Sequence, residues 1–191
     1  MMTCSPTTPP SVDKKPADSA AGIITVGVLS DTHGHLYPQV RQALAGVDHI
    51  IHAGDVGSAQ VLAELRTLAP VTAVRGNCDL DAWAEGLPVT AELELGGARI
   101  LVGHIAGRLH GRAEATGHVP GSTFAAVITG HSHVGAMERR EGTLYLNPGS
   151  AGPQRFARPR TVALLTIRPA PAAGSGGVQV GAEILAVSSR E

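Results

Sequence analysis

Short apolar runs alternate with longer amphipathic segments in the first half of the chain. Apolar residues recur with helical spacing in Tyr37–Ala45 and Ala59–Ala69, with Ser58 as a candidate N-cap of the second segment and Pro70 as its stop. The apolar runs are rich in Val and Ile, as strands buried on both faces are. They lie at Ile24–Leu29, His49–Ala53, Val71–Val74, Ala98–Val102 and Ala125–Thr129. The alternation predicts parallel strands joined by crossover helices.

The second half of the chain is mostly β in pattern. Two pairs of strands flank the tight turns Gly96-Gly97 and Glu141-Gly142, which is typical of hairpins. The paired segments are Thr90–Leu95 with Ala98–Val102 and Met137–Arg140 with Thr143–Leu146, and the late strands are Thr161–Ile167 and Val178–Val187. We therefore expect an α/β fold with two packed sheets and helices outside.

Length and composition favour one globular domain. The 191 residues are 43% hydrophobic, which excludes a wholly disordered chain. Residues 1–22 are rich in Pro, Ser and Thr and predict a flexible N-terminal tail ahead of a single domain over 23–191. The formal net charge of -1 and the lack of a basic stripe or recognition-helix motif argue against sequence-specific nucleic-acid binding.

Cysteine usage and the N-terminal segment bear on location. Cys4 and Cys78 are too few and too far apart for a secreted disulfide framework. The first residues lack the apolar core of a signal peptide, and no run approaches the roughly 18 apolar residues of a spanning helix. A cytoplasmic protein without a membrane partner is the expectation.

All five apolar runs end at a residue that can bind a metal ion. Glycine comes directly before four of these residues and lets the backbone turn sharply. Functional crevices in open α/β sheets lie at the carboxyl ends of the strands. The five residues are Asp31, Asp55, Asn77, His104 and His131.

Two of these strand ends carry a second candidate ligand. His33 follows Asp31, and His133 follows His131, at a spacing of i and i+2 that points side chains to one face of an extended chain. Carboxylate, imidazole and amide donors together suit manganese, iron, zinc or nickel. Each residue alone has a structural explanation as a cap or a hydrogen-bonded side chain. The ordered set of seven instead favours a pair of metals that share a bridging carboxylate.

The ordered series resembles the calcineurin-like metallophosphoesterase superfamily. It comprises Asp31-x-His33, Gly54-Asp55, Gly76-Asn77-Cys78-Asp79, Gly103-His104 and Gly130-His131-Ser132-His133. The SDTHGH start and the segment Asn147-Pro148-Gly149-Ser150 look most like the small bacterial and archaeal phosphodiesterase branch, and the resemblance covers about residues 23–168. It implies a four-layer α/β/β/α sandwich of two mixed sheets.

The same resemblance implies a ligand set and a reaction. Asp31, His33, Asp55 and His133 would hold one divalent ion, and Asp55, Asn77, His104 and His131 the other, with Asp55 as the bridge. Manganese is favoured, and nickel, iron, zinc or magnesium are alternatives. A hydroxide bridging the two ions would attack phosphorus, so that Asp55, Asn77 and His104 form the catalytic site.

The residue after Asn77 bears on the substrate. Phosphatases and nucleases of the superfamily often carry histidine there, acting on the leaving group, whereas this chain has Cys78. A thiol is a weaker acid and hydrogen-bond donor than imidazolium. Cys78 therefore favours diesters with good leaving groups.

Several further residues have a functional and a structural interpretation. Asp79 either orients a metal-bound histidine or caps a turn, and His52 is a candidate partner of a ligand. Arg108 and Arg112 either balance phosphoryl charge or are solvated surface arginines. His110 and His118 either touch substrate or lie on the surface.

Three functions follow from these expectations. The leading one is a dinuclear-metal-dependent phosphodiesterase acting on a small phosphodiester or phosphate ester, and a homo-oligomer is possible. The alternatives are a phosphomonoesterase using the same site, and a noncatalytic metal-binding interaction scaffold like the sorting-complex subunit of eukaryotic retromer. The scaffold hypothesis predicts that some metal ligands are replaced by other residues, whereas all seven predicted ligands are present here.

Overall fold

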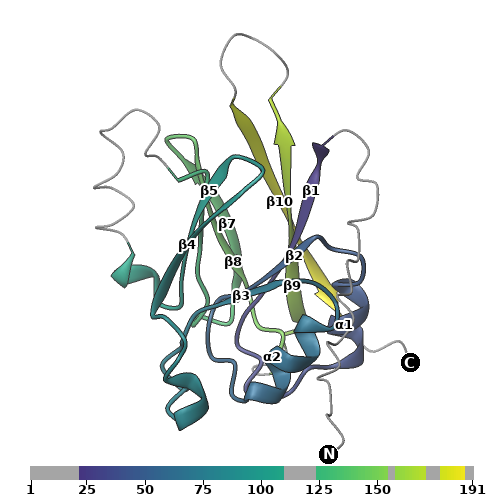
Figure 1. The fold of residues 1–191 in the computed structure, drawn as a ribbon, viewed down its shortest axis with the longest axis vertical. Coiled ribbons are helices and arrows are strands. Elements are labelled where there is room, and N and C mark those ends of the chain that lie inside the picture. The colour runs from purple at the N-terminus through teal and green to yellow at the C-terminus, as the bar shows by residue number, and fades with distance from the viewer. Residues whose placement is uncertain (1–21, 110–123, 155–157, 171–176, 188–191) are drawn as a thin grey trace, which may run out of the picture.

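The protein is a sandwich of two five-stranded sheets (Figure 1). The computed structural model describes residues 22–109, 124–154, 158–170 and 177–187, so the predicted tail lies outside the described residues except for Gly22. Sheet A has the strand order β10-β9-β1-β2-β3, and sheet B has the order β4-β5-β6-β8-β7. The elements are β1 (Ile24–Leu29), α1 (Pro38–Ala43), β2 (His49–His52), α2 (Ala59–Arg66), β3 (Val71–Ala73), η2 (Ala82–Ala84), β4 (Thr90–Leu95), β5 (Ala98–Gly103), η3 (Ala106–Arg108), β6 (Ala126–Ile128), β7 (Gly135–Arg140), β8 (Thr143–Pro148), β9 (Arg160–Pro169) and β10 (Val178–Val187).

Both sheets are mixed, as predicted. In sheet A, β1, β2 and β3 run parallel, and β9 and β10 add an antiparallel hairpin beside β1. In sheet B, β5, β6 and β8 run parallel, and β4 and β7 pair antiparallel at the two edges. Each sheet thus contains three parallel strands whose carboxyl ends lie at one edge.

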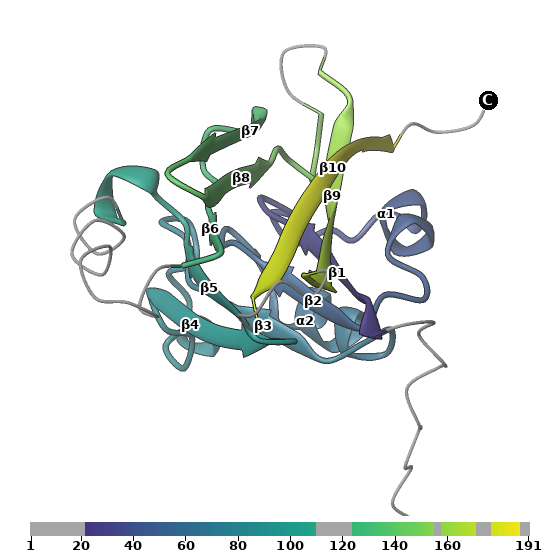
Figure 2. The same ribbon diagram turned by 90° about the horizontal axis from the view of Figure 1, so that it is seen from above.

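The main core lies between the sheets. Val26 and Val28 of β1 pack with Ile100 and Ile128 of sheet B, and all four side chains are fully buried. A second cluster lies under α1 and α2, which cover the other face of sheet A (Figure 2). On the outer face of sheet B, the described residues form a smaller cluster that includes Leu109, just after η3. The predicted α/β sandwich is therefore confirmed.

The helices are shorter than their sequence pattern predicts. Ser58 caps α2 by accepting a hydrogen bond from the Val61 amide at 3.4 Å, as expected. Both helices end early because their last turns tighten to bonds three residues apart, from the Ala45 amide to Gln42 and from the Leu68 amide to Leu65. No helix in the described part of the chain is long and apolar enough to cross a membrane.

Backbone hydrogen bonds join the loops at the carboxyl ends of the parallel strands. The Asp31 amide donates to Gly54 at 3.0 Å, connecting the loops after β1 and β2. The Gly130 amide donates to His104 at 3.0 Å, connecting the loops after β6 and β5. The Ala151 amide donates to Ser30 at 2.9 Å and ties the loop after β8 in sheet B to β1 in sheet A. The predicted site residues therefore lie at one edge of the sandwich, in loops that backbone hydrogen bonds hold together.

Candidate metal centre

The predicted ligands share an uncommon backbone conformation. Among the described residues, six that are not glycine have positive φ, and five of them are predicted ligands: Asp31, His33, Asp55, His131 and His133, at 47–70°. Asp and His tolerate this left-handed region better than most residues. Asp31 and His33 do meet in one group of possible ligand atoms. The extended-chain explanation is wrong for both i and i+2 pairs, because both residues of each pair have a left-handed backbone.

Glycines allow these turns to approach one another closely. A Cβ on Gly76 would lie 2.0 Å from Asp55 Oδ1, and one on Gly54 would lie 2.7 Å from the ring of His104. Neither position admits a side chain, because real Cβ contacts are longer than this. Gly54 and Gly76 are thus required by the packing of one loop that carries a predicted ligand against another.

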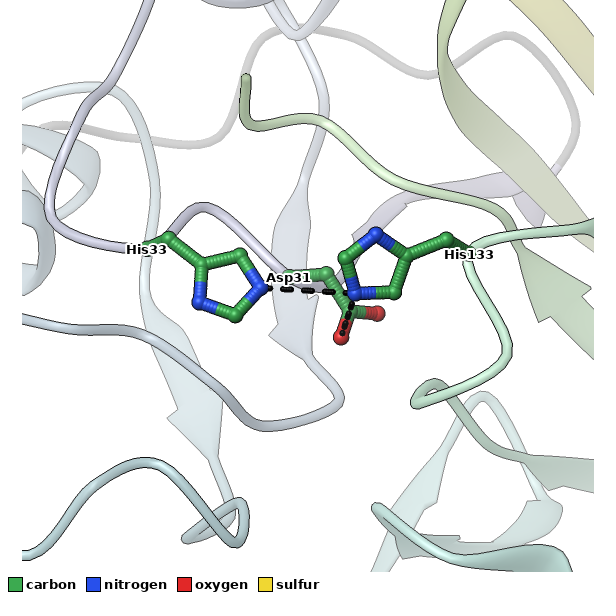
Figure 3. A group of neighbouring side chains, drawn as sticks. All are labelled: Asp31, His33 and His133. Atoms are coloured by element: carbon green, nitrogen blue, oxygen red, sulfur yellow. Dashed lines mark hydrogen bonds and ion pairs between the residues drawn. The ribbon is translucent and has the colours of Figure 1, made fainter. Parts of the chain in front are cut away.

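Asp31, His33 and His133 form the first group of ligand atoms (Figure 3). His133 Nε2 lies 3.1 Å from Asp31 Oδ1 and 3.3 Å from His33 Nε2, so the three side chains converge from the loops after β1 and β6. The Ser30 hydroxyl donates to Asp31 Oδ2 at 2.6 Å, and the His131 amide donates to the same oxygen at 3.1 Å. These bonds leave Oδ1 facing the group.

Asp55 and His104 form a second, buried pair across the two sheets. His104 Nε2 lies 3.4 Å from Asp55 Oδ2, and its Nδ1 lies 2.8 Å from the carbonyl oxygen of Ala53. The other oxygen of Asp55 accepts a hydrogen bond from the Cys78 amide at 2.8 Å. Burial raises the pKa of Asp55, but His104 and the Cys78 amide outweigh it and hold the pKa below its ordinary value. The carboxylate is therefore charged and aimed at the centre of the site.

The cost of burying the Asp31 carboxylate is only partly offset by its neighbours in the protein alone. Burial raises its pKa above the ordinary value, with Asp55 contributing in the same direction, although Ser30, His104 and His133 pull the other way. Asp31 Oδ1 and His104 Nε2 are two of the four buried side-chain atoms of the described residues that have no hydrogen-bond partner; the others belong to Gln39 and His52. Two nearby carboxylates and an unsatisfied imidazole nitrogen fit a divalent cation, which would neutralise the acids and accept the nitrogen lone pair.

The ligand groups overlap. Among the described residues, possible ligand atoms within 4.8 Å of one another occur in three sets: Asp31–His33–His133, Asp31–Asp55–His104 and His33–Asp55–Cys78. Asp31, His33 and Asp55 each belong to two of them. Five of the seven predicted ligands are thereby brought into one continuous cluster.

The other two predicted ligands lie at the margin of this cluster. The ring of His131 is 5.2 Å from that of His104, centroid to centroid, in an edge-on arrangement. Asn77 is exposed, and its Nδ2 donates to Cys78 Sγ at 3.3 Å. Asn77 and His104 both line a cleft of about 330 Å³. Cys78 is also exposed and lies near Asp55 and His33.

Supporting residues hold the ligand loops in place. Asp79 caps turns, one of the two roles expected for it, because its carboxylate accepts hydrogen bonds from the amides of Val56, Gly57 and Gly76. The Thr32 hydroxyl donates to Val56 at 2.9 Å and contacts His52 Nε2 at 2.9 Å. His52 is fully buried and its pKa is lowered by burial to about 4, so it is neutral at pH 7.

The cleft, the end of β8 and the loop after it hold further polar residues. Arg75 and Arg108 line the cleft, and Arg75 was not singled out from the sequence. Ser150 Oγ donates to the Asp31 carbonyl at 3.2 Å, and Asn147 Nδ2 donates to that of Gly130 at 2.7 Å. Sequence analysis also missed Ser30 and Thr32, for which the only signal is a small hydroxyl residue on each side of Asp31. Arg112, His110 and His118 lie outside the described residues.

Comparison with known proteins shows the family of this chain. Residues 24–169 match the calcineurin-like phosphoesterase superfamily domain. A probable metallophosphoesterase of Methanothermobacter thermautotrophicus is 32% identical over 73% of this chain and 84% of its own length. A phosphodiesterase of Methanocaldococcus jannaschii is 28% identical over 65% of this chain and 82% of its own length.

Solved structures share the fold. A predicted phosphoesterase from Streptococcus pneumoniae has a TM-score of 0.59 at 27% identity and covers 76% of this chain and 83% of its own. Vacuolar protein sorting 29 from Cryptosporidium parvum has a TM-score of 0.62 at 19% identity, covering 86% of this chain and 98% of its own, which shows the fold alone. On the family match and the archaeal relatives, this chain belongs to the calcineurin-like phosphoesterase superfamily.

Proposed function

We propose that the protein is a phosphodiesterase that depends on two divalent cations, with manganese as the favoured ion. The observation that carries this proposal is the overlap of the three ligand groups, which share Asp31, His33 and Asp55. Asp31, His33, Asp55 and His133 are assigned to one cation. Asp55, Asn77, His104 and His131 are assigned to the other.

Bound in this cluster, the cations would lower the pKa of a water molecule for attack on phosphorus and would stabilise the charge that develops on the phosphoryl oxygens. The chain supplies the positions. Ser30 and the His131 amide hold the Asp31 carboxylate in place, and the Cys78 amide holds that of Asp55. Neither carboxylate would therefore need to reorient when the cations bind. A protein nucleophile is not needed in this scheme.

The cleft beside Asn77 and His104 is proposed to hold the ester group of the substrate. Arg75 and Arg108 line it and can donate hydrogen bonds to phosphoryl oxygens. Its walls also include Leu80 and Val89, which are 85% and 44% exposed and offer apolar contact to an organic substituent. A phosphate ester with an organic group on the oxygen fits these walls.

Cys78 supports a diester rather than a monoester as the substrate. Its exposed thiol takes the place of the histidine described above and is a poor proton donor to a departing alkoxide. The jannaschii relative is named a phosphodiesterase, in agreement with this choice. The complete ligand set favours catalysis over a purely structural scaffold.

The test is metal restoration. Protein stripped of metal is supplied in turn with manganese, nickel, zinc, iron(II) or magnesium and assayed with an aryl phosphodiester and its matching monoester. We expect no turnover without metal, the highest rate with manganese and a faster rate on the diester. The absence of turnover with every metal, in protein shown to bind two ions, would contradict the enzymatic proposal. A monoester preference would replace it with a phosphomonoesterase.

A further inference from the structure

A second recess adjoins the ligand cluster at its His133 end. It has a volume of about 160 Å³ and is lined by His133 together with Ser132, Ser150, Gln154, Arg158 and Arg160. The cleft of the proposed ester site meets the cluster elsewhere, at Asn77 and His104, and the two hollows share no lining residue. A substrate bound at the candidate metal site can therefore extend into both the cleft and the recess.

The two hollows differ in charge. The recess contains two arginines and, among the described residues, no carboxylate. The cleft contains two arginines and three carboxylates, those of Asp79, Asp81 and Glu85. An anionic group is therefore attracted to the recess more strongly than to the cleft.

The guanidinium of Arg160 is held in a fixed orientation. Its Nε donates to the carbonyl oxygen of Gly152 at 3.0 Å, and its central carbon lies 3.5 Å from the centroid of the Tyr37 ring. Stacking and one hydrogen bond leave the terminal nitrogens as donors with little rotamer freedom to lose. Arg158, two residues earlier, is exposed at the same recess and brings a second guanidinium.

The recess is also rigidly connected to Asp31. A Cβ on Gly152 would lie 2.2 Å from the carbonyl oxygen of Asp31, so these two backbones are in close contact. Ser150 Oγ donates to that same oxygen at 3.2 Å, and the Thr161 amide donates to Ser150 at 2.9 Å. Arg160, which donates to Gly152, therefore has a fixed position relative to the first ligand group.

We propose that this recess binds a second phosphate group of the substrate, which makes the substrate class a phosphodiester that also carries a phosphomonoester. The inference rests on the proposed function, because the first phosphate is placed on the metal ligands. A phosphomonoester carries about 1.5 to 2 negative charges at pH 7, whereas a carboxylate carries one. The two guanidinium groups of the recess therefore favour a phosphomonoester over a carboxylate.

The kinetic test compares two p-nitrophenyl esters of one nucleoside phosphate, with and without a phosphate on the other sugar hydroxyl. We expect kcat/KM to be about tenfold higher for the phosphorylated ester, mainly through KM. Arg158→Gln is expected to remove most of this preference while leaving the plain ester unaffected. Arg160→Lys keeps a charge but loses the planar fork, so the loss should be smaller. Arg66→Gln, at an exposed arginine of α2, is the matched control and should change neither ester.

A binding measurement separates this inference from the proposed activity. Calorimetry on manganese-loaded protein compares a nucleoside bisphosphate with the monophosphate, neither of which needs to turn over. We expect about tenfold tighter binding of the bisphosphate, lost in Arg158→Gln and retained in Arg75→Gln. If neither ester is hydrolysed but this difference persists, the phosphodiesterase proposal fails and the anion site stands. Equal affinities in the unsubstituted protein, or loss in Arg75→Gln alone, would overturn the recess proposal.

Discussion

The two sheets supply different chemistry to the same site. Sheet A contributes the oxygen donors Asp31, Asp55 and Asn77 together with His33, whereas sheet B contributes imidazoles alone. The pairs Asp31–His133 and Asp55–His104 each join a carboxylate of sheet A to an imidazole of sheet B. The carboxylates of the candidate site therefore all belong to sheet A, and the two pairs of candidate ligands are also contacts between the sheets at this edge.

Among substitutions of the candidate ligands, Asp55→Ala on sheet A is expected to have the largest effect on metal binding and turnover. This side chain belongs to two ligand groups, so its loss should abolish tight binding of two metals and lower turnover by on the order of 10³-fold. Elemental analysis after dialysis gives the metal count. Retention of two ions per chain would refute the bridging assignment.

His133→Ala on sheet B is expected to have a smaller effect on metal content and activity. The variant removes one imidazole from the first group and leaves Asp55 and His104 intact, so one ion should remain, with activity reduced about 100-fold. The same dialysis and elemental analysis apply. Loss of both ions from this variant would place the shared ligand on sheet B instead of sheet A.

His52 of sheet A gives the site a pH-dependent stability. Its pKa lies at about 4, below the ordinary 6.5, so between these values the unfolded chain binds more protons than the folded one. The free energy of unfolding should fall by roughly 3 kcal/mol as the pH drops from 6.5 to 4. His52→Gln should flatten this fall.

Denaturant unfolding of metal-free protein at a series of pH values measures this effect. The difference between the original chain and His52→Gln isolates the histidine from the carboxylates that titrate nearby. Parallel pH curves for the two proteins would mean that His52 is not the group responsible.

Asp79→Asn weakens sheet A's side of the site without removing a proposed ligand. The carboxylate accepts hydrogen bonds from three backbone amides in the loops after β2 and β3. The NH₂ group of asparagine cannot accept a hydrogen bond, so at least one of these amides would face another donor. We expect a loss of about 2 kcal/mol in unfolding free energy. Thermal unfolding with and without manganese measures it, and Asp81→Asn, at an exposed acid nearby, is the control. An unchanged midpoint would contradict the bracing role.

Cys78→His is the mildest change and sharpens the substrate preference. Imidazole at this exposed position beside Asp55 is expected to raise the monoester rate about tenfold by assisting the leaving group. Rates on the aryl monoester and diester are compared under the same metal. An unchanged or lower monoester rate would remove Cys78 as the determinant.

The sequence was most informative where chemistry and local pattern coincide. Strands buried on both faces leave apolar runs, and a polar residue two positions after the run marks the functional edge, so the sequence alone could indicate Asp31, Asp55 and His104. The left-handed backbone at Asp31 and Asp55 could not be predicted, because it follows from loops that pack against one another. The helix ends were overestimated because apolar spacing does not distinguish a last α-turn from a tighter one.

Charge placement was the least predictable feature. Arg160 is one of several arginines along the chain, and nothing local marks it. Its orientation depends on Tyr37, which is distant in sequence but adjacent across the fold. Asp79 likewise had two plausible roles, and only the positions of three amides decided between them.

The left-handed backbone at five candidate ligands also limits how this site can change over evolution. Only Gly, Asn, Asp and a few others occupy that region at low energy, so most single substitutions there lose conformational stability as well as function. Asn is the exception, since it accepts the geometry and removes the charge that burial opposes at Asp31. Such a replacement would exchange activity for stability, and a lineage released from selection for turnover would be expected to drift along that route first.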